Sequence, residues 1–478
     1  MKNIDLNSVI NPLAMRAGLI SLRGHKIALP GVSSLEPLMR GCNQREWLER
    51  LVLAGIRHLV VPLNGRDEDG CLYARRHPQS TTMPLAQGGE PPKSNASVLY
   101  DLKSRDEGFF ARLQFLLDTA DSLGVMIGLS LFNATASPLP GGPFGTGANI
   151  QGLTLVQSGG ARQKQFNEKS LPHGLEPMEE ILYTALNWIA AEARGRPGVW
   201  MEIFRGDAGL DSSIQALEQK LTRRLATVLA RPAQSGKKPQ AGPWIVSSPG
   251  ANWHGMNLNL AAPFDIWRGK EPEYNDLFTL SREIIEHDSG ASPNSLFSSP
   301  PVPWRRPALY HFPDPDGRRH GSFPLPDRAE LWRAVMHGCW PIFPGGFAQR
   351  SGKRHWQTMT QIANFANCWA GSGYLRSCPE TLARMPSEWI ANTQATAATD
   401  GCGRYFVYFN PLANNGLDLV TLPGSYRFFW IDPVSGLGLD RGEGLNGGSR
   451  CGVPGLGASR EALLILEQED LPDPMSVW

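Results

Sequence analysis

Short apolar runs alternate with amphipathic stretches along the first three quarters of the chain. The run at residues 125–132 has the length of one buried strand, and the apolar spacing of residues 108–123 predicts a helix before it that ends at Gly124. The same unit recurs where residues 182–194 predict a helix and residues 198–207 predict a strand ending in Asp207. This alternation is typical of a parallel α/β architecture.

Eight apolar runs of strand length follow the alternation. They cover residues 28–33, 56–62, 125–132, 198–207, 244–247, 264–267, 308–312 and 340–343. Eight strands alternating with helices predict an α/β fold, the (β/α)8 TIM barrel, here preceded by a small hairpin over residues 19–29. Residues 64–105 predict a long polar loop. Residues 134–172 are too long for a simple connection, so we expect a functional loop or a partly mobile lid there.

The pattern changes near residue 372. Residues 354–370 predict a closing helix, and short apolar segments separated by Gly, Pro and Asn follow it. These segments, at 404–410, 418–422, 426–431 and 462–466, predict strands of a small antiparallel β-sandwich. We therefore expect a barrel domain over residues 1–372 and a β-sandwich accessory domain over residues 373–478.

Composition and charge argue against nucleic acid, membranes and zinc as partners of this protein. The chain has 478 residues, a net charge of +1 and a pI near 7.7, which gives no electrostatic reason to expect nucleic acid or an anionic membrane. Its seven cysteines are scattered and form no C-x-x-C pair, so neither a zinc site nor a disulfide framework is indicated. No run approaches the roughly 20 apolar residues of a membrane span, and residues 1–22 do not resemble a signal peptide. We expect a cytoplasmic protein that needs no cofactor, and the sequence does not indicate its oligomeric state.

Polar and aromatic residues gather at the predicted strand ends. In barrels of this class the ligand site is built at the carboxyl ends of the strands. The candidate substrate-binding residues there are Asn133, Arg205, Trp253, His254, Trp267, Arg268 and His311. Because sugar rings stack on aromatic faces while their hydroxyls take polar partners, this set favours a carbohydrate cleft.

Other chemistry finds little support in the sequence. Several of the 14 tryptophans must fill the core, and we assign Trp188, Trp200 and Trp332 to it. The histidines show neither H-E-x-x-H nor H-x-H spacing, so no metal site is predicted. No G-x-S-x-G elbow is present, which argues against a serine hydrolase.

Several motifs, taken in order, resemble those of apiosidase-like glycoside hydrolases. They are Gly-His-Lys-Ile-Ala-Leu at 24–29, Leu-Ala-Gly-Ile-Arg at 53–57, Trp188 with Gly-Val-Trp at 198–200, Arg-Gly-Asp at 205–207 and Leu-Trp-Arg-Ala-Val-Met-His-Gly at 331–338. The segment Phe-Trp-Ile-Asp-Pro-Val-Ser-Gly at 429–436 is similar to the W-x-D-P-x-x-G pattern of the accessory domain of that family. The resemblance covers nearly the whole chain and implies a barrel with a C-terminal β-sandwich that hydrolyses glycosidic bonds.

The resemblance also implies roles for single residues. In that family a Gly-Asp at the end of the fourth strand supplies the general acid/base, which corresponds to Asp207 here. The family nucleophile is a Glu ending the seventh strand, where this chain has His311 and Phe312 instead. Asp314, shortly after them, is the leading candidate for the second carboxylate, although a Pro-Asp-Pro-Asp-Gly turn is also common in solvent-facing loops. Glu202, within the fourth strand, is either catalytic or a buried charge paired with a cation.

Three functions stay open at this point. The first is glycoside hydrolysis by a carboxylate pair at the barrel mouth. The second is an inactive barrel that binds a glycan or a partner protein, and the third is a lyase or transglycosylase using His311. The distance from Asp207 to another carboxylate across the barrel mouth discriminates between hydrolysis and binding. About 5 to 5.5 Å indicates a retaining hydrolase and about 6.5 to 9.5 Å an inverting one, whereas no partner within about 10 Å favours the binding barrel.

Overall fold

The computed structural model describes most helices and strands of the chain. The described residues are 20–22, 25–63, 71–76, 99–133, 143, 149–151, 176–205, 212–230, 244–245, 265–267, 308–311, 328–336, 339–344, 353–369, 375–377, 383–385, 390–391, 395–400, 403–410, 416–452 and 461–469.

Eight parallel strands form the central sheet, one for each predicted run. They are β3 (Gly31–Ser33), β4 (His58–Pro62), β7 (Met126–Asn133), β8 (Val199–Arg205), β9 (Trp244–Ile245), β10 (Asp265–Trp267), β11 (Ala308–His311) and β12 (Cys339–Pro344). The sheet order is β10-β11-β12-β3-β4-β7-β8-β9, so the last strand in sequence, β12, is hydrogen-bonded to the first, β3. Strands that follow one another around a ring in this way make a (β/α)8 barrel, which confirms the predicted fold.

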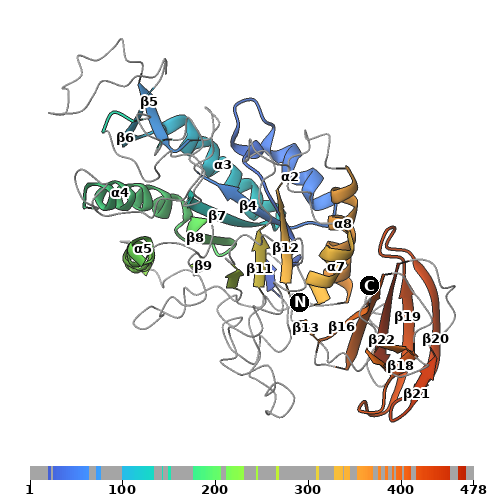
Figure 1. Cartoon of the computed structure of the whole chain (residues 1–478). Helices are drawn as coiled ribbons and strands as arrows, with labels where there is room; N and C mark the ends of the chain where they lie inside the picture. The colour runs from blue at the N-terminus through green and yellow to red at the C-terminus, as the bar shows by residue number, and fades with distance from the viewer. Residues whose placement is uncertain are drawn as a thin grey trace, which may run out of the picture.

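Helices cover the outside of the sheet (Figure 1). The described ones are α2 (Gln44–Leu53), α3 (Glu107–Leu123), α4 (Glu176–Ala193), α5 (Ser212–Ala230), α7 (Arg328–Met336) and α8 (Lys353–Cys368), with the short 3-10 helix η2 (Glu36–Leu38). The carboxylate of Asp106 accepts a hydrogen bond from the Phe109 amide and caps α3, and Gly124 ends that helix with a left-handed φ of 64°. None of the described helices is long and apolar enough to cross a membrane.

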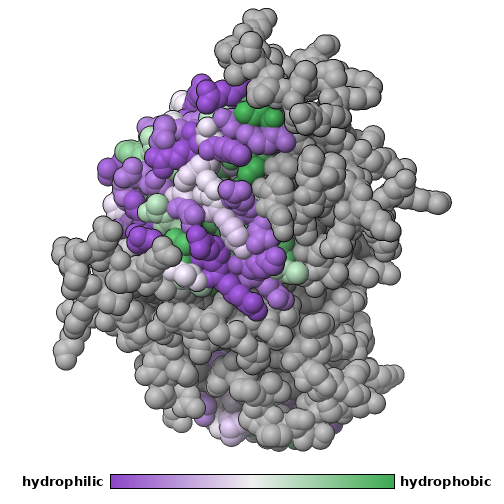
Figure 2. All heavy atoms as spheres, turned by 90° about the vertical axis from the view of Figure 1, so that its left-hand side faces the viewer, coloured by the Kyte–Doolittle hydropathy of each residue, from purple (hydrophilic) through white to green (hydrophobic). Residues whose placement is uncertain are grey.

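The helices are amphipathic, as their sequences predict. Leu186 of α4 and Leu225 of α5 are buried, whereas Glu180, Lys220 and Arg223 are exposed. Figure 2 views the side of the molecule on which α4 and α5 lie, and the described residues there are mainly hydrophilic. The apolar side of each helix therefore packs inward while its polar side meets solvent.

The segment between β4 and α3 differs from the sequence prediction. Residues 64–105 were expected to be a loop, but β5 (Tyr73–Arg76) and β6 (Leu99–Arg105) form an antiparallel hairpin within them. The reason is burial, because Tyr73, Leu99 and Leu102 are all inaccessible and require a packed partner. The predicted N-terminal hairpin is confirmed as β1 (Ile20–Leu22) paired with β2 (His25–Ile27).

The C-terminal part consists of two antiparallel sheets, which confirms the predicted β-sandwich. The first has the order β13 (Arg376–Ser377), β16 (Ala395–Thr399), β17 (Arg404–Phe409), β22 (Ala462–Gln468), β19 (Ser425–Ile431) and β20 (Gly438–Asn446). The second has the order β15 (Ile390–Ala391), β14 (Ala383–Met385), β18 (Gly416–Asp418) and β21 (Arg450–Gly452). The strand predicted at 418–422 was misplaced, because the Asp418 carboxylate accepts a hydrogen bond from the Val420 amide and turns the chain there.

One face of the larger sheet packs against α7 and α8 of the barrel (Figure 1). Trp332 of α7 stacks on Tyr408 with ring centroids 6.1 Å apart, and Phe365 of α8 meets Phe406 edge to face at 5.2 Å. Arg328 donates two hydrogen bonds, of 2.6 and 2.9 Å, to the Glu461 carboxylate. Barrel and sandwich therefore share one continuous apolar core. The predicted boundary at residue 372 falls between the described residues Trp369 and Leu375 and stays a prediction.

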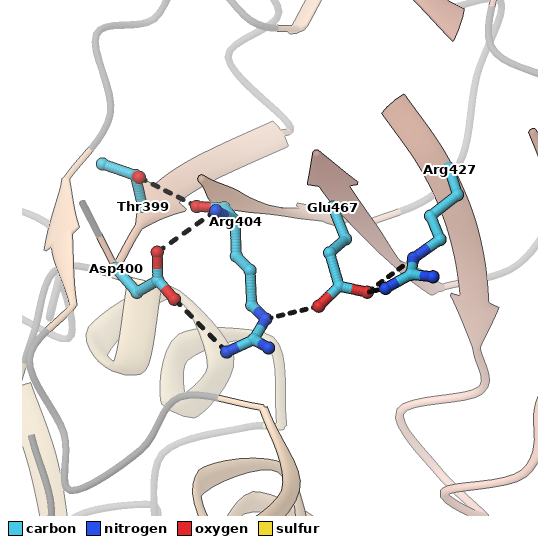
Figure 3. A network of polar contacts seen from close by, with 5 residues as sticks. All are labelled: Thr399, Asp400, Arg404, Arg427 and Glu467. Atoms are coloured by element: carbon cyan, nitrogen blue, oxygen red, sulfur yellow. Dashed lines mark hydrogen bonds and ion pairs between the residues drawn. The ribbon is translucent and has the colours of Figure 1, made fainter. Parts of the chain in front are cut away.

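The same sheet face carries a buried ion triad (Figure 3). The carboxylate of Glu467, which is 0% exposed, accepts hydrogen bonds from Arg404 Nε at 2.7 Å and Arg427 Nε at 2.8 Å. Arg404 also lies 3.7 Å from Asp400. Both arginines lie directly across from Glu467 on the neighbouring strands, so the triad joins β17, β22 and β19.

Candidate active site

The parallel strands bring their carboxyl ends to one mouth of the barrel. Among the predicted site residues, Asn133, Arg205, Trp267 and His311 are the last residues of β7, β8, β10 and β11. Trp267 lies directly across from Tyr310, so positions 267 and 311 occupy neighbouring strand ends. The backbone thus places these four positions at the mouth, and their roles in substrate binding stay predictions.

Five predicted site residues lie outside the described residues. They are Asp207, Trp253, His254, Arg268 and Asp314. The last described residue before Asp207 is Arg205, which ends β8 two positions earlier in the sequence. The pairing of Asp207 with Asp314 stays a prediction.

The barrel interior below the mouth contains a histidine–tryptophan pair. The indole Nε1 of Trp200 donates a hydrogen bond to Nε2 of His58 at 3.0 Å, and Nδ1 of His58 lies 2.7 Å from the carbonyl oxygen of Leu29. A carbonyl oxygen only accepts and an indole N–H only donates, so the imidazole is neutral with its proton on Nδ1. Complete burial lowers the pKa of His58 to about 4, against the opposing effect of the Leu29 hydrogen bond. His58 is therefore a structural group rather than an acid catalyst.

Two glycines make room for this pair. A Cβ on Gly128 would lie 2.2 Å from the Trp200 indole, and a Cβ on Gly31 would lie 2.9 Å from both the His58 ring and the Ile342 side chain. His58 and Trp200 come from β4 and β8, which flank β7, and they meet across Gly128. Side chains of non-adjacent strands converge only on the concave side of a closed sheet. This face of the strands is therefore the barrel interior.

Glu202 lies on the interior face, one level closer to the mouth. It follows Trp200 by two residues and therefore shares its side of β8. Glu202 is 0% exposed, and it lies directly across from Ser130, which is 3% exposed. Of the two orientations that the sequence left open, the structure shows the interior one. Burial of a carboxyl group at this depth is costly unless polar neighbours hold it, which makes Glu202 the most unusual described residue of the interior.

Strand alternation separates the other candidates into two groups. Position 311 lies directly across from Ile342, whose side chain approaches Gly31 and the interior pair, so position 311 belongs to the interior face. Positions 133 and 205 lie directly across from each other, and each is an odd number of residues from the interior positions Ser130 and Glu202. They therefore fall on the helix-facing side of the rim.

The core assignments of tryptophan are largely confirmed. Trp200 and Trp332 are buried, and Trp188 is half-buried against the barrel core. Within the described residues, no group of three or more His, Cys, Asp or Glu side chains is arranged to hold a metal ion.

Comparison with known proteins adds a fold relationship. No protein-family model and no curated protein matches the chain. Among solved structures, a glycoside hydrolase family 5 protein from Bacteroides vulgatus ATCC 8482 aligns with a TM-score of 0.55 at 12% identity, covering 97% of this chain and 98% of that one. A second structure, described as a glycoside hydrolase, aligns with a TM-score of 0.53 at 12% identity over 96% of this chain and 99% of its own. The chain therefore has the fold of these glycoside hydrolases, from barrel through sandwich.

Proposed function

We propose that the barrel hydrolyses a glycosidic bond in an oligosaccharide or in a side chain of a polysaccharide. The observation that carries the proposal is the path of β8, which runs through the barrel wall with Glu202 on its interior face and ends two residues before Asp207. The shared fold with glycoside hydrolases and the resemblance of the motifs to the apiosidase-like family support it.

The reaction needs two carboxyl groups on opposite sides of one bond. In the proposal the Asp207 carboxyl group donates its proton to the glycosidic oxygen as the bond to the anomeric carbon breaks. The Asp314 carboxylate either attacks the anomeric carbon or takes a proton from the attacking water. The first route retains the anomeric configuration and the second inverts it, so NMR of the first-formed sugar distinguishes them.

Glu202 is the alternative source of the second carboxylate. It replaces Asp314 in the proposal if Asp314→Asn keeps its turnover while Glu202→Gln loses it. The reverse result assigns Glu202 to the structural role of a charge held inside the barrel.

The aromatic and polar residues of the mouth supply recognition in this proposal. Trp253 and Trp267 offer faces on which a sugar ring stacks, and His254, Arg268 and His311 offer hydrogen bonds to its hydroxyls. Asn133 and Arg205 complete the predicted set from the rim.

A screen of aryl glycosides and of plant and bacterial oligosaccharides tests the proposal. We expect the native protein to release sugar from at least one of them. On an oligosaccharide, whose leaving group needs a proton, we expect Asp207→Asn to lose about 10²-fold or more in kcat. Asp118→Asn, an exposed aspartate of α3, is the matched control and is expected to match the native rate. Equal turnover of such an oligosaccharide by native protein and Asp207→Asn would contradict the assignment of Asp207 as the general acid. Glycan binding without turnover of any substrate would instead indicate an inactive binding barrel.

A further inference from the structure

Asp101 of β6 lies at a junction between two connections of the barrel. Its carboxylate accepts hydrogen bonds from Gln151 Nε2 at 2.8 Å, Ser104 Oγ at 2.8 Å and the Lys103 amide at 3.2 Å. A guanidinium nitrogen of Arg76, on β5, lies 3.5 Å away. One buried carboxylate therefore joins the hairpin to a residue 50 positions further along the chain.

The backbone reinforces the junction. The Ile150 amide donates to the Tyr100 carbonyl at 3.0 Å, and the Leu102 amide donates to Gln151 Oε1 at 2.9 Å. Tyr100 and Asn149 form a parallel β-bridge, and Asn149 Nδ2 donates to the Pro143 carbonyl at 2.7 Å. Residues 149–151 thus dock on β6 in the manner of a short added strand.

The junction is packed rather than solvated. Tyr100, Asp101 and Asn149 are each more than nine-tenths buried. Burial opposes the charged form of Asp101, but the hydrogen bonds from Gln151, Ser104 and Lys103 outweigh it and lower the pKa of the carboxyl group. Exposed loops seldom bury a charged hub in this way, which indicates a fixed arrangement.

Both partners belong to connections that leave the barrel mouth. The hairpin lies between β4 and α3, and residues 149–151 lie between β7 and α4. The base of the hairpin is anchored, because the Asp106 amide donates to the Leu72 carbonyl at 3.0 Å and Tyr73 meets Trp188 of α4 with ring centroids 6.3 Å apart. In (β/α)8 enzymes such connections shape the ligand site.

We propose that Asp101 is a positioning residue: through Gln151 it holds the hairpin β5–β6 and residues 149–151 together as one preformed wall of the mouth, and this wall sets which glycan is accepted. The wall itself is independent of the reaction, whereas its part in selecting glycans rests on the proposed function.

Hydrogen exchange in the full chain tests the wall. In Asp101→Ala and in Gln151→Ala we expect the Ile150 amide to exchange at least ~10-fold faster than in the native protein, because its hydrogen bond opens more often. The amide of Leu113 in α3 serves as an internal reference that stays protected, and Asp118→Ala is the matched control. Unchanged exchange at Ile150 in both variants would contradict the claim that Asp101 and Gln151 hold this wall together.

Substrate selectivity tests its function. For two glycosides that the native protein cleaves, we expect the variants to change the ratio of kcat/KM between them about 10-fold, mainly through KM, because the chemical groups are untouched. A parallel fall of kcat for both substrates, or an unchanged ratio, contradicts a role in selection. Failure of the native protein to cleave any glycoside would refute the proposed function alone, because the exchange measurement tests separately whether Asp101 holds the wall together.

Discussion

At the scale of single residues, the barrel interior depends on glycines that leave space for larger neighbours. Gly128 lies between β4 and β8 and lets the Trp200 indole reach His58. The contact closes the interior directly beneath Glu202. Trp200, which the sequence analysis assigned to the core, thus also fills the barrel interior directly below the candidate site.

A methyl group at position 128 tests this arrangement. We expect Gly128→Ala to lower the free energy of unfolding by about 3 kcal/mol, because the new Cβ would overlap a rigid indole and displace the strand. Gly438→Ala is the matched control, since a Cβ there meets nothing within 4 Å, and we expect a change below about 0.5 kcal/mol. Chemical denaturation of both variants measures the difference, and equal effects would contradict the packing described.

His58 predicts a pH dependence of stability. The unfolded chain binds a proton below the ordinary pKa of 6.5, whereas folded His58 stays neutral until its own pKa of about 4. Stability is therefore lost as pH falls from 6.5 towards 4, by up to ~3 kcal/mol for the full shift. Denaturation curves at pH 7 and pH 4.5 for the native protein and His58→Gln measure this term. We expect a smaller loss in the variant, and an identical loss would rule out His58 as its source.

Two features of single residues, the orientation of Glu202 and the contacts of Asp101, could not be predicted from the sequence. Alternation alone could not decide which way Glu202 points, because both faces of a barrel strand are buried. The decision came from a contact between β4 and β8, the approach of Trp200 to His58, which no local pattern encodes. Asp101 was missed for a similar reason, since its partner Gln151 is distant in sequence.

At the scale of elements, the eight barrel strands could be predicted because each is a short apolar run, and two of them follow a helix that ends at a glycine, Gly55 or Gly124. Elements without such runs were missed. The edge strand β20 is rich in glycine and charged residues and largely exposed, so its sequence resembles a loop. The hairpin β5–β6 escaped prediction because polar sequence surrounds its few buried residues.

The ion triad of the sandwich is a tertiary contact that joins three of its strands. Glu467 joins three strands through two arginines on the sheet face that meets the barrel. Losing one member of a buried ion set leaves the remaining charges without compensation, which costs more than the pair contributes.

We expect Glu467→Gln to lower the free energy of unfolding by about 3 kcal/mol, because two partly buried guanidinium groups would lose their counter-charge. Glu469→Gln, an exposed residue two positions away, is the matched control with an expected effect below about 0.5 kcal/mol. Thermal and chemical unfolding of the two variants provide the comparison. A neutral Glu467→Gln would mean that the arginines find equivalent partners in solvent.

At the scale of the whole molecule, barrel and sandwich form one packed body. The rings of Trp332 and Tyr408 stack across the interface, and α7, which carries Trp332, leads into β12 beside the strand that ends at His311. The β-sandwich therefore packs against the helix that precedes β12, the strand next to the one that ends at His311.

Shared packing predicts joint unfolding. We expect one cooperative transition, and we expect Trp332→Ala to lower the free energy of unfolding by about 4 kcal/mol through the cavity that it leaves. Hydrogen exchange should then rise together in β12 and β22. Phe115→Ala, an exposed aromatic residue of α3, is the control. Independent unfolding of the sandwich would contradict a shared core.

The order of apolar runs predicted a barrel followed by a β-sandwich, whereas it could not predict the separation of Asp207 from a second carboxylate. That separation depends on loops, whose conformation is set by contacts distant in sequence. The function therefore has to be tested by chemistry rather than by fold.

The most direct test compares two substrates of one sugar, one with a nitrophenol leaving group and one with an alkyl alcohol. If Asp207 protonates the glycosidic oxygen, Asp207→Asn should lower kcat/KM for the alkyl glycoside by about 10³-fold and affect the nitrophenyl glycoside far less, because nitrophenolate leaves without a proton. Equal rates for native protein and variant on the alkyl glycoside would contradict the role of Asp207 as the general acid, and with it the mechanism proposed for this barrel mouth.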